Sequence, residues 1–180
     1  VTVTEKSGSA VYDGQEHSVT GYESMTADNT LYNTADVAET PTEAWTAKGT
    51  NAGEYPVGIK ASDFKNTSGN FTNVEFVIVD GTLKIDPVSD KVTVTVVEKS
   101  DIVTYDGKEH SVTGYKSITA DNTLYNIADV AETPTEAWTA KGMYVGTYHV
   151  GIKASDFKNT SGNFTNVEFV IVDGDLVITP

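Results

Sequence analysis

Cysteine is absent from this chain of 180 residues, so neither disulfides nor thiolate metal ligands hold its fold. Positive charge is scarce, because 12 Lys and Arg residues stand against 26 Asp and Glu residues, a formal net charge of −14. Such a surface repels phosphates, which excludes DNA, RNA and anionic membrane surfaces as partners.

Long apolar runs are also lacking. No stretch approaches the roughly 18 residues of a membrane helix, so we expect no membrane insertion. The first residues do not form a basic and apolar leader, and we expect any export signal or wall anchor to lie outside these 180 residues.

What the sequence does contain is a long repeat. Tyr12 recurs at Tyr105, an offset of 105 − 12 = 93, and residues 1–87 align with 94–180 without a gap. Of these 87 positions 17 differ, which leaves 70 identical. We therefore predict two tandem domains, 1–88 and 89–180, copied to gain length or valency. The short joint around Pro87 predicts an extended rod cut from a longer repeat series.

Apolar and polar residues alternate with a period of two through most of each copy. Val92, Val94 and Val96 alternate with Thr, and Trp45 lies in step with Ala47, a pattern typical of half-buried strands with Trp45 in the core. Asp80-Gly81 and Asp173-Gly174 predict tight hairpin turns between the strands around them.

Turn signals divide each copy into about seven short strands, and only residues 34–39 suggest a helical turn. The predicted fold class is all-β, with two tandem immunoglobulin-like β-sandwich repeats. A β-grasp-like sheet with a short helix is the alternative.

Three motifs follow one another in a fixed order. They are Tyr-Asp-Gly-x-x-His-Ser-Val-Thr-Gly-Tyr at 12–22 and 105–115, Lys-Gly-Thr-Asn-Ala-Gly-Glu-Tyr at 48–55, and Asn-Val-Glu-Phe-Val-Ile-Val-Asp-Gly-x-Leu-x-Ile at 73–85. Together they resemble the YDG or MBG-type β-repeats of large bacterial cell-surface proteins and adhesins. The resemblance implies an extracellular location on the bacterial cell surface or cell wall, a stalk or adhesin architecture, and no enzymatic activity.

The second copy departs from the middle motif at one turn. Met143, Tyr144 and Val145 replace Thr50-Asn51-Ala52, which places three adjacent apolar residues on a loop. Because a plain spacer has no use for them, we predict a contact surface there, either with a neighbouring repeat or with an external partner.

Two functions are consistent with these observations. The first is a structural stalk repeat of an adhesin that projects a binding region from the cell wall. The alternative is a multivalent binding module whose loops engage a host glycan or protein. In both cases we expect a monomer.

The best candidate for a cation site is a polar loop. Asp28, Asn29, Asn33 and Asp36 could supply oxygen ligands to calcium, although turn formation accounts for Asp and Asn in a loop equally well. No other cofactor is indicated.

Three further sets of residues have both a chemical and a structural interpretation. Asp13, His17 and Ser18 are the residue types of a hydrolase triad, but neighbouring strand residues point to opposite faces, so no catalytic residue is predicted. Tyr22, Tyr32 and Trp45 could form a carbohydrate platform or belong to the core. Lys6 or Lys60 with Asn73 and Glu75 could form an isopeptide crosslink.

Overall fold

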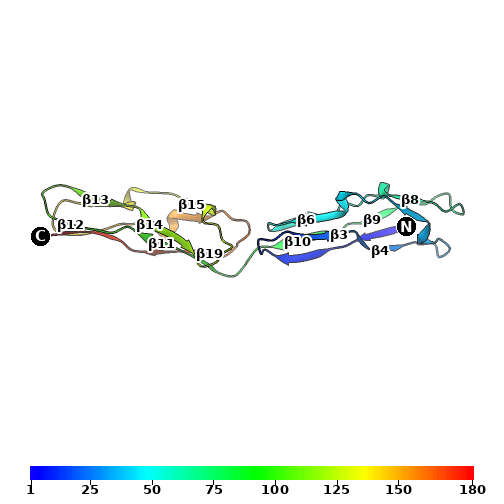
Figure 1. The fold of residues 1–180 in the computed structure, drawn as a ribbon, viewed down its shortest axis with the longest axis horizontal. Helices are drawn as coiled ribbons and strands as arrows, with labels where there is room; N and C mark the ends of the chain where they lie inside the picture. The colour runs from blue at the N-terminus through cyan, green and yellow to red at the C-terminus, as the bar shows by residue number, and fades with distance from the viewer. The chain divides into compact units, whose positions relative to one another are not determined.

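The computed structural model describes residues 1–180 and divides them into two compact units, Val1–Pro87 and Val88–Pro180. The all-β class and the tandem β-sandwich arrangement are confirmed, since the only helical segments are 3₁₀ turns of three residues (Figure 1). None of these turns has the length and apolar character that a bilayer crossing requires. The second unit begins at Val88 because its N–H donates to the carbonyl of Asn163, at 2.8 Å.

The first unit contains ten strands and three 3₁₀ turns. They are β1 Thr2–Glu5, β2 Gly8–Val11, β3 His17–Thr20, β4 Tyr22–Thr26, η1 Thr34–Asp36, β5 Val37–Glu39, η2 Glu43–Trp45, β6 Thr46–Gly49, β7 Gly53–Pro56, η3 Ala61–Asp63, β8 Phe64–Asn66, β9 Val77–Val79 and β10 Thr82–Asp86.

The second unit repeats this order. Its elements are β11 Val92–Glu98, β12 Asp101–Thr104, β13 His110–Thr113, β14 Tyr115–Ala120, η4 Ile127–Asp129, β15 Val130–Glu132, η5 Glu136–Trp138, β16 Thr139–Gly142, β17 Gly146–His149, η6 Ala154–Asp156, β18 Phe157–Asn159, β19 Val167–Val172 and β20 Asp175–Thr179.

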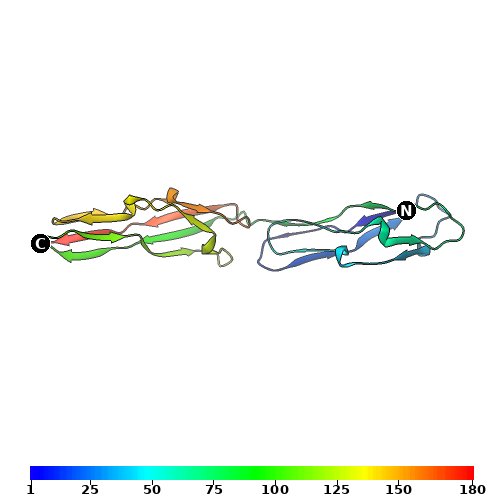
Figure 2. The same cartoon turned by 90° about the horizontal axis from the view of Figure 1, so that it is seen from above.

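Four small sheets make up each unit. In the first unit they have the orders β4-β1-β9, β2-β10-β7, β3-β6 and β5-β8, and the second unit has the same pattern with β11 to β20. The first two strands of a unit pair in parallel with its last two, as Val3 with Ile78 and Ser9 with Lys84. Within each unit the strands run along its long axis, so the chain enters at one end and leaves at the other (Figure 2).

The predicted hairpins at Asp80-Gly81 and Asp173-Gly174 are wrong. β9 pairs with β1, whereas β10 pairs with β2 and β7, so the Asp-Gly step carries the chain from one sheet into the next. Gly81 does not have a positive φ angle. It is required for space, since a Cβ atom there would lie 2.2 Å from the carbonyl oxygen of Lys6.

Strands are also more numerous and shorter than the sequence predicts. Gly21 shows why, because its φ of 79° breaks the run from His17 to Thr26 into β3, which pairs with β6, and β4, which pairs with β1. A left-handed residue is accessible mainly to glycine, and here it moves the chain between two sheets.

A core of aliphatic and aromatic side chains fills the space between the sheets of each unit. Trp45 is 6% exposed, as expected from its alternation with Ala47, and its ring lies 5.4 Å from that of Phe64. The ring of Phe64 in turn stacks on that of Phe76 at 5.6 Å. Trp138, Phe157 and Phe169 repeat this stack in the second unit. The remaining buried residues of the first core are Val3, Ala47, Val57, Ile59, Leu83 and Ile85.

A buried glutamate ties three segments of each unit together. The carboxylate of Glu5 is 3% exposed and accepts hydrogen bonds from the backbone N–H groups of Ile59, at 2.7 Å, and Gly81, at 2.6 Å. Glu98 makes the same two bonds in the second unit. Residues 57–60 alternate in polarity like a strand but pair with no strand. The side chain of Glu5 accepts the hydrogen bond of Ile59 in place of a neighbouring strand.

Candidate functional site

The differences between the two copies gather on one sheet. Four lie on β2, three on the turn at residues 50–52, two on β7 and three on β10, which makes twelve of the seventeen. These strands form the sheet β2-β10-β7, whose counterpart is β12-β20-β17. Any property that distinguishes the second copy from the first is therefore expected on this sheet.

Within β10 the differences follow the alternation of the strand. The inward residues Leu83 and Ile85 are 3% and 2% exposed and are identical in the second copy. The outward residues Thr82, Lys84 and Asp86 are all replaced. The core is thus held fixed while the outer face changes.

The outer face is charged in the first unit. Lys84 pairs across the sheet with Ser9 on one side and Glu54 on the other. Its ammonium also lies 3.1 Å from a carboxylate oxygen of Asp86. Opposite charges on neighbouring strands stabilise this surface modestly and keep it hydrated.

The same positions are mostly apolar in the second unit. Val177 replaces the lysine of the first unit, and it pairs with Ile102 on β12 and with Thr147 on β17. Ile102 takes the place of the serine and Thr147 that of the glutamate. Ile102 is 71% exposed. A solvent-facing row of β-branched side chains therefore crosses the sheet.

The predicted contact residues extend this apolar face. Met143, Tyr144 and Val145 form the turn before β17, and all three are exposed, Tyr144 to 67%. We call Ile102, Val177 and these three residues the apolar face. An exposed group of this kind is typical of contact surfaces, whereas single apolar residues are not.

The turn keeps its shape without help from these three side chains. The hydroxyl of Tyr148 donates to the carbonyl of Tyr144 at 3.0 Å, and the ring of Tyr148 packs on Gly142, where a Cβ atom would lie 2.2 Å away. In the first unit Tyr55 holds the turn in the same way, through a 2.8 Å bond to the carbonyl of Asn51. Side chains at 143–145 are therefore free to serve a contact.

A histidine and an aspartate lie beside the apolar face in the second unit only. Nδ1 of His149 lies 2.6 Å from Oδ1 of Asp175, and the two residues face each other on β17 and β20. Pro56 and Thr82 occupy these positions in the first unit, so both members of the pair change together.

Two of the four calcium candidates, Asn29 and Asn33, are arranged as turn residues. Oδ1 of Asn29 accepts from the N–H of Leu31 and Oδ1 of Asn33 from the N–H of Ala35, so both amide oxygens serve the backbone. Asp36 contributes its carbonyl, which accepts from Thr67. Nowhere in the chain do three His, Asp or Glu side chains converge as metal ligands would. The turn interpretation accounts for Asn29 and Asn33, whereas the carboxylate of Asp28 makes no hydrogen bond, and a calcium site here stays a prediction.

The histidine of the first motif also has a local role. Nε2 of His17 lies 2.9 Å from Oδ1 of Asp13, an oxygen that also accepts from the N–H of Gln15. Both bonds lower the pKa of the Asp13 carboxyl, and the bond from Gln15 has the larger effect. Ser18 lies on the opposite, exposed face of β3 from His17, so the three side chains do not line up as a triad.

Aromatic residues of the proposed carbohydrate platform belong to the core. Nε1 of Trp45 donates to Asp63 at 2.8 Å, and Tyr22 packs edge-on against Trp45. Tyr32 is 8% exposed. No ring face of Trp45 is open to a sugar. The candidate crosslink residues Lys6, Lys60, Asn73 and Glu75 are all exposed.

Ile102 and Val177 were not singled out from the sequence. The signal was present, because a serine and a lysine of one copy become isoleucine and valine in the other. Their adjacency, however, depends on the parallel pairing of β12 with β20, which joins residues 75 positions apart (177 − 102).

No protein-family model, curated protein or solved structure matches this chain.

Proposed function

We propose that this chain is a pair of structural stalk repeats of a bacterial cell-surface adhesin, which hold a binding region away from the cell wall. The proposal includes an extracellular location and no enzymatic activity. It combines the resemblance of the motifs to cell-surface β-repeats with a feature of the strand pairing.

That feature is the parallel pairing of the first and last strands in each unit. Because β1 runs parallel to β9 and β2 to β10, tension between the two ends of a unit pulls paired strands along their length in opposite directions. All the bonds of a pair are then loaded together and must break together. In the second unit β11 pairs in parallel with β19 and β12 with β20, so its strands are loaded in the same direction.

The motif residues support a structural role as well. Gly14 has a φ of 76°, and Asp13 bonds the backbone of the same turn. Gly49 accommodates the ring of Tyr55. The first two motifs therefore shape turns, which is what a spacer module requires of its sequence.

Single-molecule force spectroscopy tests this proposal. Pulling on the two ends of the chain should give two unfolding events, from units whose extended lengths are about 300 Å for Val1–Pro87 and slightly more for Val88–Pro180, at about 3.5 Å per residue. The second unit should unfold at the higher force, because β11 pairs with β19 from Val92 to Val97 whereas β1 pairs with β9 only from Thr2 to Thr4.

The control changes the direction of force and keeps the bonds. Val77 is exposed and the chain has no cysteine, so Val77→Cys provides a single handle beside the start of β1. Pulling between this handle and the N-terminus loads the β1·β9 bonds one after another, and the unfolding force should fall. Equal forces in both geometries would contradict the mechanical role.

A second candidate function is a binding module, and the apolar face favours it. Ile102 and Tyr144 are large apolar side chains that are mostly exposed, and their counterparts in the first unit are polar. A plain spacer has no use for such a surface. A glycan array and a host-protein binding screen, run with the chain and with a Met143→Thr, Tyr144→Asn, Val145→Ala variant, test this function. Binding that is lost in the variant supports it, and the first unit is the internal negative control.

A further inference from the structure

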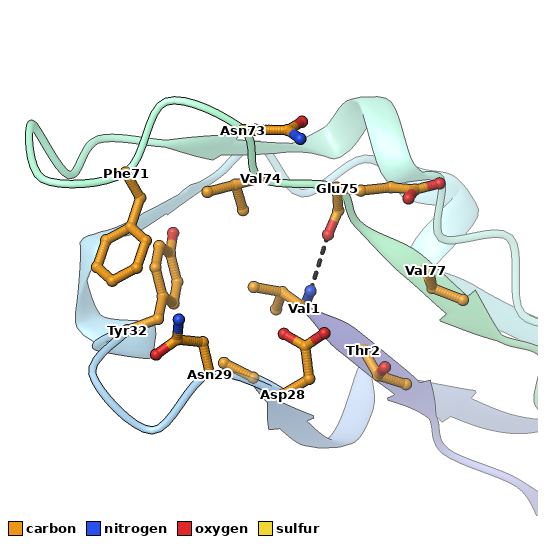
Figure 3. A pocket seen from close by; sticks show the side chains of 11 residues that line it. Val1, Thr2, Asp28, Asn29, Tyr32, Phe71, Asn73, Val74, Glu75 and Val77 are labelled. Carbon is orange, nitrogen blue, oxygen red and sulfur yellow. Dashed lines mark hydrogen bonds between the residues drawn. The ribbon is translucent and has the colours of Figure 1, made fainter.

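A hollow of about 360 Å³ opens at the N-terminal end of the first unit. The side chains of Asp28, Tyr32, Phe71 and Val74 surround it, and the N-terminal ammonium of Val1 donates to the carbonyl of Glu75 at its rim, at 2.8 Å (Figure 3). Several polar groups here make no hydrogen bond within the unit. They are the carboxylate of Asp28 and the side chain of Asn73, which line the hollow, and the backbone N–H and hydroxyl of Thr72, which lies between the lining residues Phe71 and Asn73 in the chain.

In the second unit a segment of the chain covers the same surface. Val1 aligns with Val94, and residues 88–93, which come before Val94, run over the groups that correspond to the hollow. Val92 in this segment is 0% exposed and pairs in parallel with Val167. The second copy thus shows what fits this surface.

Hydrogen bonds fix the segment along its whole length. The carbonyl of Val88 accepts from the N–H of Thr165 at 3.1 Å, and the N–H of Val92 donates to the carbonyl of Asn166 at 2.8 Å. Thr93 donates to the carboxylate of Asp121 at 2.9 Å and accepts from its N–H. The remaining contacts are those of Val88 N–H with the carbonyl of Asn163, Thr165 Oγ1 with the carbonyl of Val88, Asn166 Nδ2 with the carbonyl of Ser89, and the ion pair of Lys91 with Glu168.

Every residue that bonds this segment in the second unit has an identical counterpart in the first unit. None of the seventeen differences falls between residues 57 and 81 or between 26 and 33. The counterparts of Asp121, Asn163, Thr165, Asn166 and Glu168 are Asp28, Asn70, Thr72, Asn73 and Glu75.

The covered surface is also better ordered into strands. β19 begins at Val167, but its counterpart β9 begins at Val77, which aligns with Val170, three residues later. Phe164 is 3% exposed, whereas Phe71 is only partly buried. A segment laid over the hollow would supply the missing partner for residues 74–76.

We propose that the hollow of the first unit is a strand-acceptor site that binds an extended linker segment of the type Val-Ser-Asp-Lys-Val-Thr, joined directly to Val1. The segment runs parallel to residues 73–76, its second valine enters the hollow, its threonine bonds Asp28, and its lysine pairs with Glu75. The linker of such a repeat is therefore an integral strand of the repeat that follows it. The bond from Val1 to Glu75 persists, since an amide N–H replaces the ammonium.

The test extends the full chain at its N-terminus with Val-Ser-Asp-Lys-Val-Thr. Amide hydrogen exchange is followed by NMR at Asp28 and Thr72, and we expect it to slow about tenfold when each N–H gains a partner. A Gly-Ser extension of equal length is the matched control, and a second extension carries Asp in place of its second valine. Neither should slow exchange.

Three results would overturn the proposal. One is unchanged exchange at Asp28 and Thr72 in the extended chain. Another is equal protection from the Gly-Ser extension, which would assign the effect to removal of the terminal charge. The third is protection that grows with the concentration of the unextended chain, which would identify a strand captured from a second molecule. Val92→Ala in the parent chain should speed exchange at Asp121 and Thr165, and no change there would remove the comparison that carries the inference.

Discussion

The two copies have identical buried core residues, and most of their differences lie on one outer face. In the first unit Ser9, Lys84 and Glu54 form a polar row across the sheet β2-β10-β7. In the second unit a row led by Ile102 and Val177 takes their place, beside a turn that is also apolar. The fold tolerates either surface because inward residues alone pack between the sheets. Stability and surface chemistry are thus set by different residues of the same strands.

The largest expected effect concerns a feature that the copies share. Trp45→Ala and Trp138→Ala should each destabilise their own unit by about 3–5 kcal/mol, because each removes a buried ring and its hydrogen bond to an aspartate. In the Trp45→Ala variant, urea unfolding followed by circular dichroism should show an early transition, while Trp138 fluorescence reports an unchanged second unit. An unmoved first transition would contradict a core role.

The buried glutamates come next. Glu5→Gln and Glu98→Gln should each cost about 1–3 kcal/mol, because glutamine offers one acceptor and turns an amide donor toward a backbone N–H. Chemical denaturation of each variant gives the free energy of unfolding. Glu75→Gln is the control, since that side chain is exposed, and it should have no effect. A large effect in one copy only would show that the two cores are not equivalent.

A smaller effect depends on pH. The hydroxyl of Tyr115 donates to Glu132 at 2.5 Å. This bond is the main cause, and burial the second, of the rise in the pKa of Tyr115 to about 12. Tyr22, bonded to Glu39, also has a raised pKa. A phenol whose pKa is higher in the folded state stabilises it below the unfolded pKa near 10 and loses this contribution as the pH rises toward 12.

Denaturation of the chain and of Tyr115→Phe at pH 9 and above checks the sign. The variant should be less stable at pH 9, by about 0.5–1.5 kcal/mol, and the gap should narrow at higher pH. A gap that widens with pH would contradict the assignment of the shift to this hydrogen bond.

The smallest effect is expected at the turn that differs. Met143→Thr, Tyr144→Asn and Val145→Ala together should change the stability of the second unit by less than about 0.5 kcal/mol, because Tyr148 and Gly142 hold the turn. Calorimetry gives the melting temperature, and sedimentation velocity reports self-association. A lowered melting temperature would show that these side chains support the fold and are not reserved for a contact.

Local patterns in the sequence predict much of this structure. Alternation places Val92, Val94 and Val96 in the core, where each is 0% exposed, and Trp45 follows the same rule. Asp13-Gly14 forms the expected turn. These features depend on a few neighbouring residues, so one sequence is enough to reveal them.

The pairing of strands that are far apart in the sequence could not be predicted from such local patterns. Nothing near Val3 indicates that Ile78 is its partner, and the Asp80-Gly81 step has the composition of a hairpin turn although it joins two sheets. The burial of Glu5 is predictable from the sequence, since it falls on the same strand face as Val3. An acidic residue in register with core valines is a candidate for a buried carboxylate with backbone partners.

The pairing of first strands with last strands also constrains how the protein is made. As the chain emerges during synthesis, β1 and β2 have no partners until β9 and β10 follow them, so each unit stays open until its final residues appear. Vectorial synthesis completes the first unit before the competing β11 exists. Refolding from denaturant offers both sets of strands at once, and because Val77–Val79 and Val170–Val172 are identical, it should yield exchanged pairings that the nascent chain avoids.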